Sequence, residues 1–361
     1  MYPTIDLSRK GLFSLCSQRG IGLVEVMIGM TLGLVLLAGI SGYFISGKKT
    51  DNTAEGLNQI SENARYISGK LGLEIRMAGY TGPVQLTPTN LLNSATTLAY
   101  QYSVAITGFN NVTSGALPVA LNIHLTGDAQ PLTNTDVLIL RTTRDMQPVP
   151  LSVNSTASTA TVVTNINAAV RTCNVGTAVS GICAGDVLLI SDYRKAAVFQ
   201  ASAITEAGAI SHAASGTPGN ATVSWSGSDL SFGSNSEIIP YQTVTYYIAN
   251  NADHVPTLYR KENAAVAVAL IPGVANMQIT YGEDTDNDKS VDAYRDAAAV
   301  TNWSNVLSIR VALLMTSRND NLVTTPVALS EPALPSGATT ATDRRLYKPL
   351  IFTAALRNRV Q

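Results

Sequence analysis

The residues with the clearest potential for chemistry form an acidic run late in the chain. Its candidate metal ligands alternate along the sequence: Asp284, Asp286, Asp288, Ser290 and Asp292. Carboxylate and carbonyl oxygens at this spacing match the first nine positions of a calcium-binding loop, in which hard oxygen atoms converge on one cation. Lys289 stands where such loops carry glycine, and Arg295 stands where they carry a bidentate glutamate. Two interpretations therefore stay open, a weak calcium site and a solvated acidic turn between strands.

A second candidate is a single carboxylate near the start of a long apolar segment. Glu25 directly precedes Val26–Ile45, about 20 largely apolar residues, which are enough to span a bilayer. A charge near this segment is costly in lipid unless a partner neutralises it, so we interpret Glu25 as a functional residue. An ordinary secretory signal has a shorter apolar region and is removed. A plain membrane anchor would explain the length of the segment but not Glu25 or the preceding Gly20.

The cysteines predict one crosslink. Cys16 lies in the N-terminal leader, which leaves Cys173 and Cys183 close together in a later loop. In an oxidising compartment this pair predicts a disulfide, and the alternative is two free buried thiols. The spacing does not suit a zinc site, because no second Cys/His pair lies nearby.

Nothing in the sequence predicts an enzyme. The three histidines are far apart, and no metalloprotease, serine-hydrolase or dinucleotide-binding motif occurs. We expect no required cofactor, with calcium as the single candidate. A net charge of −1 and a charged fraction of 14% argue against binding to nucleic acid through overall charge. A basic cluster near the C-terminus is interpreted as a solvated strand edge rather than a DNA-binding face: Arg344, Arg345, Lys348, Arg357 and Arg359.

The elements that position these residues fall into four segments. Residues 1–20 form a basic leader, and residues 21–46 form the apolar span. Residues 47–79 have the spacing of an amphipathic helix that ends at Gly79. Its apolar stripe consists of Leu57, Ile60, Ala64, Ile67, Leu71 and Ile75. Residues 80–361 combine short β-type runs with long polar loops, which predicts a β-rich domain outside the membrane.

Several runs in this domain are rich in Val, Ile, Tyr and Thr and predict strands. They are Ala99–Ile106, Asp136–Arg141, Asp186–Ser191, Ala197–Ala201, Val244–Ile248, Thr257–Arg260, Met277–Tyr281, Val306–Leu314 and Pro349–Leu356.

The N-terminal segment resembles a type IV prepilin signal. From Arg19 it reads Arg-Gly-Ile-Gly-Leu-Val-Glu-Val-Met and then becomes apolar. The resemblance implies that a prepilin peptidase cuts between Gly20 and Ile21, and that Ile21 becomes an N-methylated N-terminus. It also implies that Glu25 neutralises the α-amino group of a neighbouring subunit. Ile21 departs from the commonest first residue, phenylalanine, but is also apolar.

Later stretches are similar to PilW-type minor pilins: Glu62–Arg65, Glu74–Tyr80, Val274–Gly282 and Phe352–Arg359. The resemblance covers both ends of the chain and leaves residues 84–235 unmatched. It implies an α+β, type IV pilin-like fold, in which a long N-terminal helix packs on an antiparallel β-sheet with long loops.

The function implied is that of a minor pilin, which primes assembly of a type IV pilus, lies at or near the fibre tip, and supports motility or adhesion. The implied partners are other minor pilins, the major pilin, the prepilin peptidase and the assembly platform. The chain would be a single-pass inner-membrane protein with a periplasmic C-terminal domain, and later part of the fibre. Two alternatives stay open, a minor pseudopilin of a type II secretion system and a membrane-anchored adhesin or ligand-binding protein.

Overall fold

The computed structural model describes most of the chain. The described residues are 22–82, 87–93, 95–112, 129–144, 148–152, 155, 159–161, 178–179, 181–205, 208–214, 216–221, 230–263, 265–329 and 331–359. The chain divides into two compact units, Met1–Asn52 and Thr53–Gln361.

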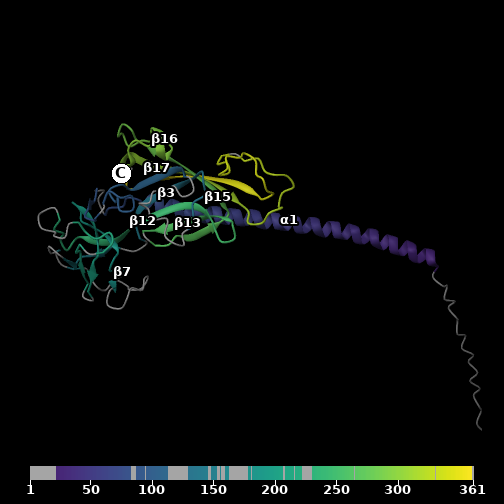
Figure 1. Cartoon of the computed structure of the whole chain (residues 1–361), viewed down its shortest axis with the longest axis horizontal. Helices are drawn as coiled ribbons and strands as arrows, with labels where there is room; N and C mark the ends of the chain where they lie inside the picture. Colours follow the sequence, from purple (N-terminus) through teal and green to yellow (C-terminus); the bar gives the residue numbers. More distant parts are fainter. Residues whose placement is uncertain are drawn as a thin grey trace, which may run out of the picture. The chain divides into compact units, whose positions relative to one another are not determined.

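One α-helix, α1, extends from Leu23 to Met77 (Figure 1). The apolar span and the amphipathic segment predicted from the sequence are therefore parts of one continuous helix. The helix ends close to the predicted stop, because Gly79 adopts a φ of 71°, a left-handed conformation that glycine reaches without a Cβ clash. The Tyr80 N–H donates to the Met77 carbonyl and closes the last turn.

The largest sheet in the second unit has nine strands, and its central strand is β12 (Glu237–Asn250). β12 pairs antiparallel with four other strands of this sheet. The remaining strands are β1 (Thr89–Asn90), β2 (Ile106–Val112), β3 (Thr135–Thr143), β4 (Val149–Pro150), β8 (Val187–Ser191), β9 (Ala196–Gln200), β13 (Pro256–Glu262) and β14 (Val268–Pro272). The sheet is antiparallel as predicted except at one edge, where the short strand β1 pairs parallel with β9.

A second, four-stranded sheet carries the C-terminal part of the chain (Figure 1). Its order is β16-β15-β17-β18, all antiparallel. The bounds are β15 (Val274–Glu283), β16 (Ala293–Arg295), β17 (Val306–Thr316) and β18 (Tyr347–Ala355). The Asp136 carboxylate of β3 connects the two sheets, because it accepts hydrogen bonds from Asn111 N of β2 (2.8 Å) and Ile279 N of β15 (2.7 Å).

Smaller elements complete the described structure. A three-stranded sheet has the order β10-β11-β5, and β6 pairs with β7. Their bounds are β5 (Thr159–Thr161), β6 (Ala178–Val179), β7 (Ile182–Cys183), β10 (Ala203–Ile204) and β11 (Ala209–Ser211). Two short 3₁₀ helices, η2 (Ala297–Ala299) and η3 (Trp303–Asn305), precede β17.

The main hydrophobic core lies between the second half of α1 and both large sheets. From α1 it takes Ile60, Ile67, Leu71 and Ile75, all at most 1% exposed. From the sheets it takes, among others, Leu138, Leu140, Val244, Ile248, Ile279 and Val311. This arrangement confirms that the amphipathic half of the helix packs on the β domain of its own chain.

Two details of the sequence prediction are wrong. Leu57 is 44% exposed, because Gly56 occupies the buried position on this turn of α1. The predicted strand Ala99–Ile106 consists of turns up to Ala105, and β2 starts only at Ile106. Where the predicted strand would begin, the backbone carbonyls accept hydrogen bonds from side chains instead of from a neighbouring strand. Arg141 Nη2 donates to Leu98 O, and Thr243 Oγ1 donates to Ala99 O.

Candidate functional site

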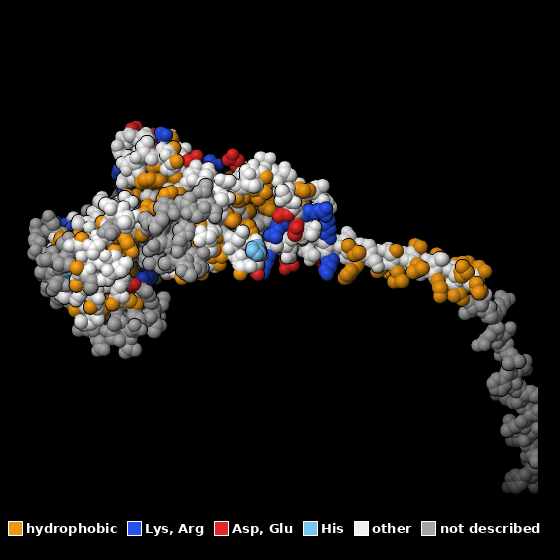
Figure 2. Space-filling view, viewed as in Figure 1, with side chains coloured by type: hydrophobic (Ala, Val, Ile, Leu, Met, Phe, Trp, Pro, Cys, Tyr) orange, Lys and Arg blue, Asp and Glu red, His pale blue; other side chains and the backbone are white. Residues whose placement is uncertain are grey.

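The first part of α1 exposes nearly all of its apolar side chains. The large hydrophobic residues between Leu23 and Ile45 are 43–84% exposed, and Figure 2 shows patches of hydrophobic side chains along this part of the helix. Within the described residues, α1 is the one helix that is long and apolar enough to cross a membrane. Apolar surface of this extent is typical of a segment that contacts lipid or other apolar helices.

Glu25 lies in the first turn of this helix. Its N–H donates to the Gly22 carbonyl (2.9 Å), and its carboxylate is exposed, with no partner among the described residues. The position suits an acid, because the partial positive charge at a helix N-terminus favours a carboxylate. The two predicted processing residues, Gly20 and Ile21, lie outside the described residues, so cleavage between them stays a prediction.

Within the second unit, α1 is held where it meets the C-terminal loops. Gly56 faces Leu322 and Leu346, and a Cβ at this position would lie 2.9 Å from Leu322 Cδ1 and 3.2 Å from Leu346 Cδ1. One turn earlier, Thr53 Oγ1 donates to Leu322 O (3.3 Å). The absent side chain of Gly56 therefore lets these leucines approach the helix closely.

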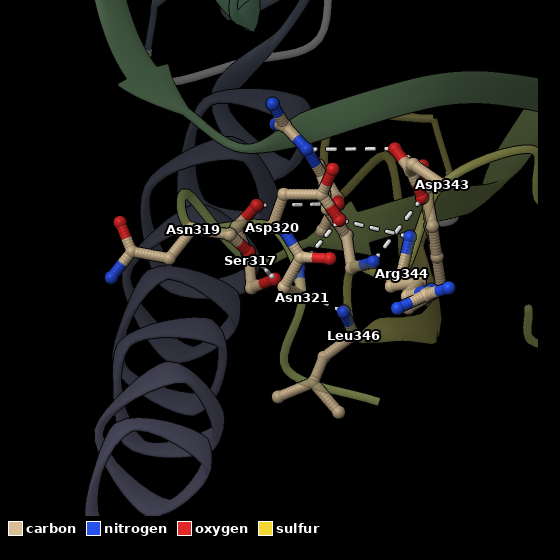
Figure 3. Close-up of polar contacts among 10 residues, drawn as sticks. Ser317, Asn319, Asp320, Asn321, Asp343, Arg344 and Leu346 are labelled. Carbon is tan, nitrogen blue, oxygen red and sulfur yellow. Dashed lines mark hydrogen bonds and ion pairs between the residues drawn. The ribbon is translucent and has the colours of Figure 1, made fainter. Parts of the chain in front are cut away.

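The two loops that carry these leucines are joined by the polar contacts in Figure 3. Ser317 N donates to Leu346 O (2.9 Å), and Leu346 N donates back to Ser317 Oγ (3.0 Å). The Asp320 carboxylate accepts from Asn321 N (2.6 Å) and Arg344 N (2.9 Å). Because the contacts connect the two loops directly, both leucines are fixed against α1 as one structure.

A second attachment point, which the sequence analysis missed, is Glu74. This residue is 8% exposed and its carboxylate accepts a hydrogen bond from Tyr246 Oη of β12 (2.7 Å). It also forms ion pairs with Arg260 Nη2 of β13 (3.2 Å) and Lys70 Nζ (3.1 Å). Arg260 in turn contacts Glu262. The sequence does contain a signal for this burial. Ile60, Ile67 and Glu74 are spaced seven residues apart, which places Glu74 on the same buried face of the helix.

The acidic run lies in the loop between β15 and β16, and the structure brings together part of the predicted ligand set. Ligand oxygens of Asp284, Asp286 and Asp292 all lie within 4.8 Å of one another. Asp288 is outside this group of carboxylates, and its carboxylate accepts from Ser290 N (2.7 Å). The calcium ligand set therefore stays a prediction, with three carboxylates that are close enough to share an ion.

Two of the same aspartates also accept hydrogen bonds from backbone N–H groups of their own loop. Asp284 accepts from Asn287 N (2.6 Å) and Lys289 N (2.9 Å). Asp292 accepts from the hydroxyl and the N–H of Thr285, and these hydrogen bonds hold the pKa of Asp292 below its ordinary value. Asp292 is thus ionised at neutral pH, and hydrogen bonds to the loop backbone hold both carboxylates in place. Lys289 takes a φ of 68°, so it adopts the left-handed turn for which calcium loops normally use glycine.

The predicted disulfide is only half described. Cys183 lies in β7, is 8% exposed and is disulfide-bonded. Cys173 lies outside the described residues, so the pairing of Cys173 with Cys183 stays a prediction.

Comparisons with known proteins address the class of protein. The family model described as Type IV Pilus-assembly protein W matches residues 245–358. The model described as Prokaryotic N-terminal methylation motif matches residues 15–41. No curated protein sequence matches the chain. Among solved structures, a type IV-like pilin from Thermus thermophilus is 13% identical, with a TM-score of 0.21 over 48% of this chain and 84% of that one.

The two family matches confirm the resemblance to PilW-type type IV minor pilins. The first covers most of the C-terminal half of the domain, including β13 to β18 and the acidic loop, and the second covers Glu25 and most of the span. The structural similarity is too small to support an argument, and the α+β architecture rests on α1 and its sheets. The matched models describe a pilus-assembly protein and a methylation motif, and the apolar helix with this motif fits membrane anchoring and association with a pilus.

Proposed function

We propose that the chain is a minor pilin that is processed between Gly20 and Ile21, is held in the inner membrane by α1, and primes type IV pilus assembly at or near the fibre tip. The observation that supports it most directly is Glu25, a carboxylate in an exposed apolar helix that has no partner among the described residues. In lipid such an acid requires a neutralising partner. The methylated α-amino group of a neighbouring pilin provides the complementary charge.

In this proposal the C-terminal domain is periplasmic before assembly. The apolar part of α1 then leaves the lipid for the helix bundle of the fibre, where it meets the corresponding helices of other minor pilins and of the major pilin. The second half of α1 stays attached to its own domain through Gly56 and Glu74, so that assembly moves the domain together with the helix.

The test compares Glu25→Gln with Glu62→Gln, which changes an exposed acid in the other half of the same helix. We expect the first variant to be absent from sheared pili and the second to be incorporated normally, because only Glu25 lies in the apolar segment. Intact-mass analysis of the native protein should show a chain that starts at methylated Ile21. Normal incorporation of Glu25→Gln, or a mature chain that retains Met1, would contradict the proposal.

A deletion strain separates the alternatives. Loss of pili with normal protein secretion supports the minor pilin, whereas loss of secretion with normal pili would assign the chain to a type II secretion system. Loss of adhesion alone, with pili present and functional, would favour a membrane-anchored adhesin.

We also propose that the acidic loop binds calcium through Asp284, Asp286 and Asp292. Three carboxylates within 4.8 Å repel one another, and a cation would offset this repulsion. The ligand set is incomplete compared with a calcium-binding loop, so we expect weak affinity, roughly 10⁻⁴–10⁻³ M.

Calcium should therefore raise the melting temperature of the full-length protein in detergent, and a chelator should reverse the effect. Asp286→Asn should remove the response, while Asp288→Asn, in the same loop but outside the group, should keep it. If wild-type melting is the same with calcium and with chelator, the loop is a solvated turn. If Asp288→Asn also removes the response, the larger ligand set predicted from the sequence is correct.

A further inference from the structure

The last strand of the nine-stranded sheet, β14, gives this sheet an apolar and uncharged edge. β14 pairs antiparallel with β13, and no other described strand pairs with it. From Ala265 to Pro272 the sequence reads Ala-Val-Ala-Val-Ala-Leu-Ile-Pro, which contains no charged residue. Val266 and Val268 are 52% and 65% exposed. The side of β14 that faces away from β13 therefore borders exposed apolar side chains and lacks a partner strand among the described residues.

Other sheet edges of the described chain are protected against pairing with a further strand. Several consist of strands of only two or three residues, among them β1 and β16. β2 lies against the 3₁₀ helices η2 and η3. β18 is longer, but it carries Lys348 and Pro349, which are both exposed. Short length, covering elements, charged side chains and proline are the means by which natural proteins prevent association between sheet edges. β14 carries no charge, and its one proline, Pro272, is its last residue.

The backbone of β14 is held in place by side chains at both ends. Asn63 Nδ2 of α1 donates to Pro272 O (3.2 Å). Just before the strand begins, Lys261 Nζ of β13 donates to Ala265 O (2.7 Å). A segment that is already ordered loses less conformational entropy on association than a flexible one. The edge is therefore prepared for pairing in the free chain.

The charged residues beside β14 are compensated within the chain. Arg260 lies opposite Val268 on β13. Its guanidinium contacts Glu74 and Glu262. Lys261 is 1% exposed, so it presents no charge at the surface. Like charges that face each other on paired strands are destabilising, and two copies of this uncharged edge bring none together. The edge is therefore complementary to itself.

We propose that the β14 edges of two copies of this chain pair antiparallel across a two-fold axis, so that their nine-stranded sheets become continuous. Main-chain N–H and C=O groups provide the affinity, as in other proteins in which a strand is added to a sheet edge. The two-fold axis lets each copy use the same strand. Because β14 has only five residues, the interface is small, and we expect a weak dimer with a dissociation constant in roughly the micromolar range.

The experiment measures the oligomeric state of the full-length protein in detergent by analytical ultracentrifugation over a range of protein concentrations. Val268→Lys places a charge on the edge, and the two-fold axis brings two such charges together. Ile351→Lys is the matched control, because Ile351 is 46% exposed on β18, an edge strand of the other large sheet. We expect a monomer–dimer equilibrium for the wild type, weakened roughly tenfold or more by Val268→Lys and unchanged by Ile351→Lys.

A second measurement locates the contact by crosslinking. Val268→Cys and Ile351→Cys are each made together with Cys16→Ser, which removes the cysteine of the leader, and are treated with a short bismaleimide. Cys183 is disulfide-bonded and does not react. We expect crosslinked dimers from Val268→Cys and none from Ile351→Cys, because antiparallel pairing across a two-fold axis brings the two copies of residue 268 close together.

A wild-type protein that is monomeric at every concentration would overturn the proposal, as would open-ended aggregation in place of a dimer. A dimer that Val268→Lys and Ile351→Lys weaken to the same extent, or that neither weakens, would overturn it too, since association would then arise elsewhere, such as in the apolar part of α1. Equal crosslinking from both cysteine positions has the same meaning. Melting temperatures equal to that of the wild type check that the variants are folded.

Discussion

Two glutamates in one helix have opposite surroundings. Glu25 is exposed among apolar side chains and has no described partner, whereas Glu74 is 8% exposed and contacts Tyr246, Arg260 and Lys70 of its own chain. The partners of Glu74 attach the helix to its domain. Any partner of Glu25 has to come from outside the described residues. Glu74 therefore stabilises the folded chain, whereas the Glu25 carboxylate is exposed and available for contact with another molecule.

The apolar residues of α1 follow the same division. Leu34 is 65% exposed and Leu71 is 1% exposed, although both are leucines in the same continuous helix. Burial within the chain gives Leu71 a direct role in folding stability, and Leu34 has none until another apolar surface covers it.

The largest effect on stability should come from Leu71→Ala. Removing this buried side chain should lower the free energy of unfolding of the domain by about 2–5 kcal/mol. The variant buries less apolar surface on folding, and the cavity that remains lacks packing contacts. Urea unfolding of the full-length protein in detergent measures the change. Leu34→Ala is the matched control and should leave the domain transition in place. An equal loss of unfolding free energy in both variants would contradict the conclusion that only the second half of α1 packs in the core of its own chain.

A smaller loss is expected for Glu74→Gln, about 1–3 kcal/mol, because the neutral amide weakens the ion pairs with Arg260 and Lys70 but keeps the shape of the side chain. Arg260 retains Glu262, which limits the effect. The same urea experiment applies, with Glu62→Gln as the exposed control. Pilus incorporation of Glu74→Gln should persist as long as the domain is folded, in contrast to Glu25→Gln. Stability equal to that of the wild type would show that the ion pairs contribute nothing net.

The smallest predicted effect concerns Gly56→Val, with a net loss of about 1 kcal/mol from crowding against Leu322 and Leu346. Gly69 is the control in the same half of the helix, since a Cβ there would meet no atom within 4 Å. Gly69→Val should be neutral or slightly stabilising, because glycine is a poor helix former. If both valine variants behave alike, the close approach at Gly56 is not required for helix attachment.

Much of this protein was determined by local sequence patterns. Three local features predicted α1 nearly to its last turn. They are the length and apolarity of residues 26–45, the periodic apolar residues up to Ile75 and the stop at Gly79. Each depends only on residues that are neighbours in the sequence. Alternating Val, Ile, Tyr and Thr likewise located most strands, because side-chain periodicity within a strand is a local property. The resemblance of the segment around Glu25 to a prepilin signal required no tertiary information either.

The tertiary structure alone decided which residues meet across long sequence separations. Glu74 looks like an ordinary surface acid until Tyr246 and Arg260, more than 170 residues later, are placed against it. Gly56 replaces Leu57 in the interface because of the position of Leu322 and Leu346, and the acidic loop brings Asp284 to Asp292 but leaves Asp288 aside. Burial and charge pairing depend on three-dimensional neighbours, and a one-dimensional pattern does not contain them.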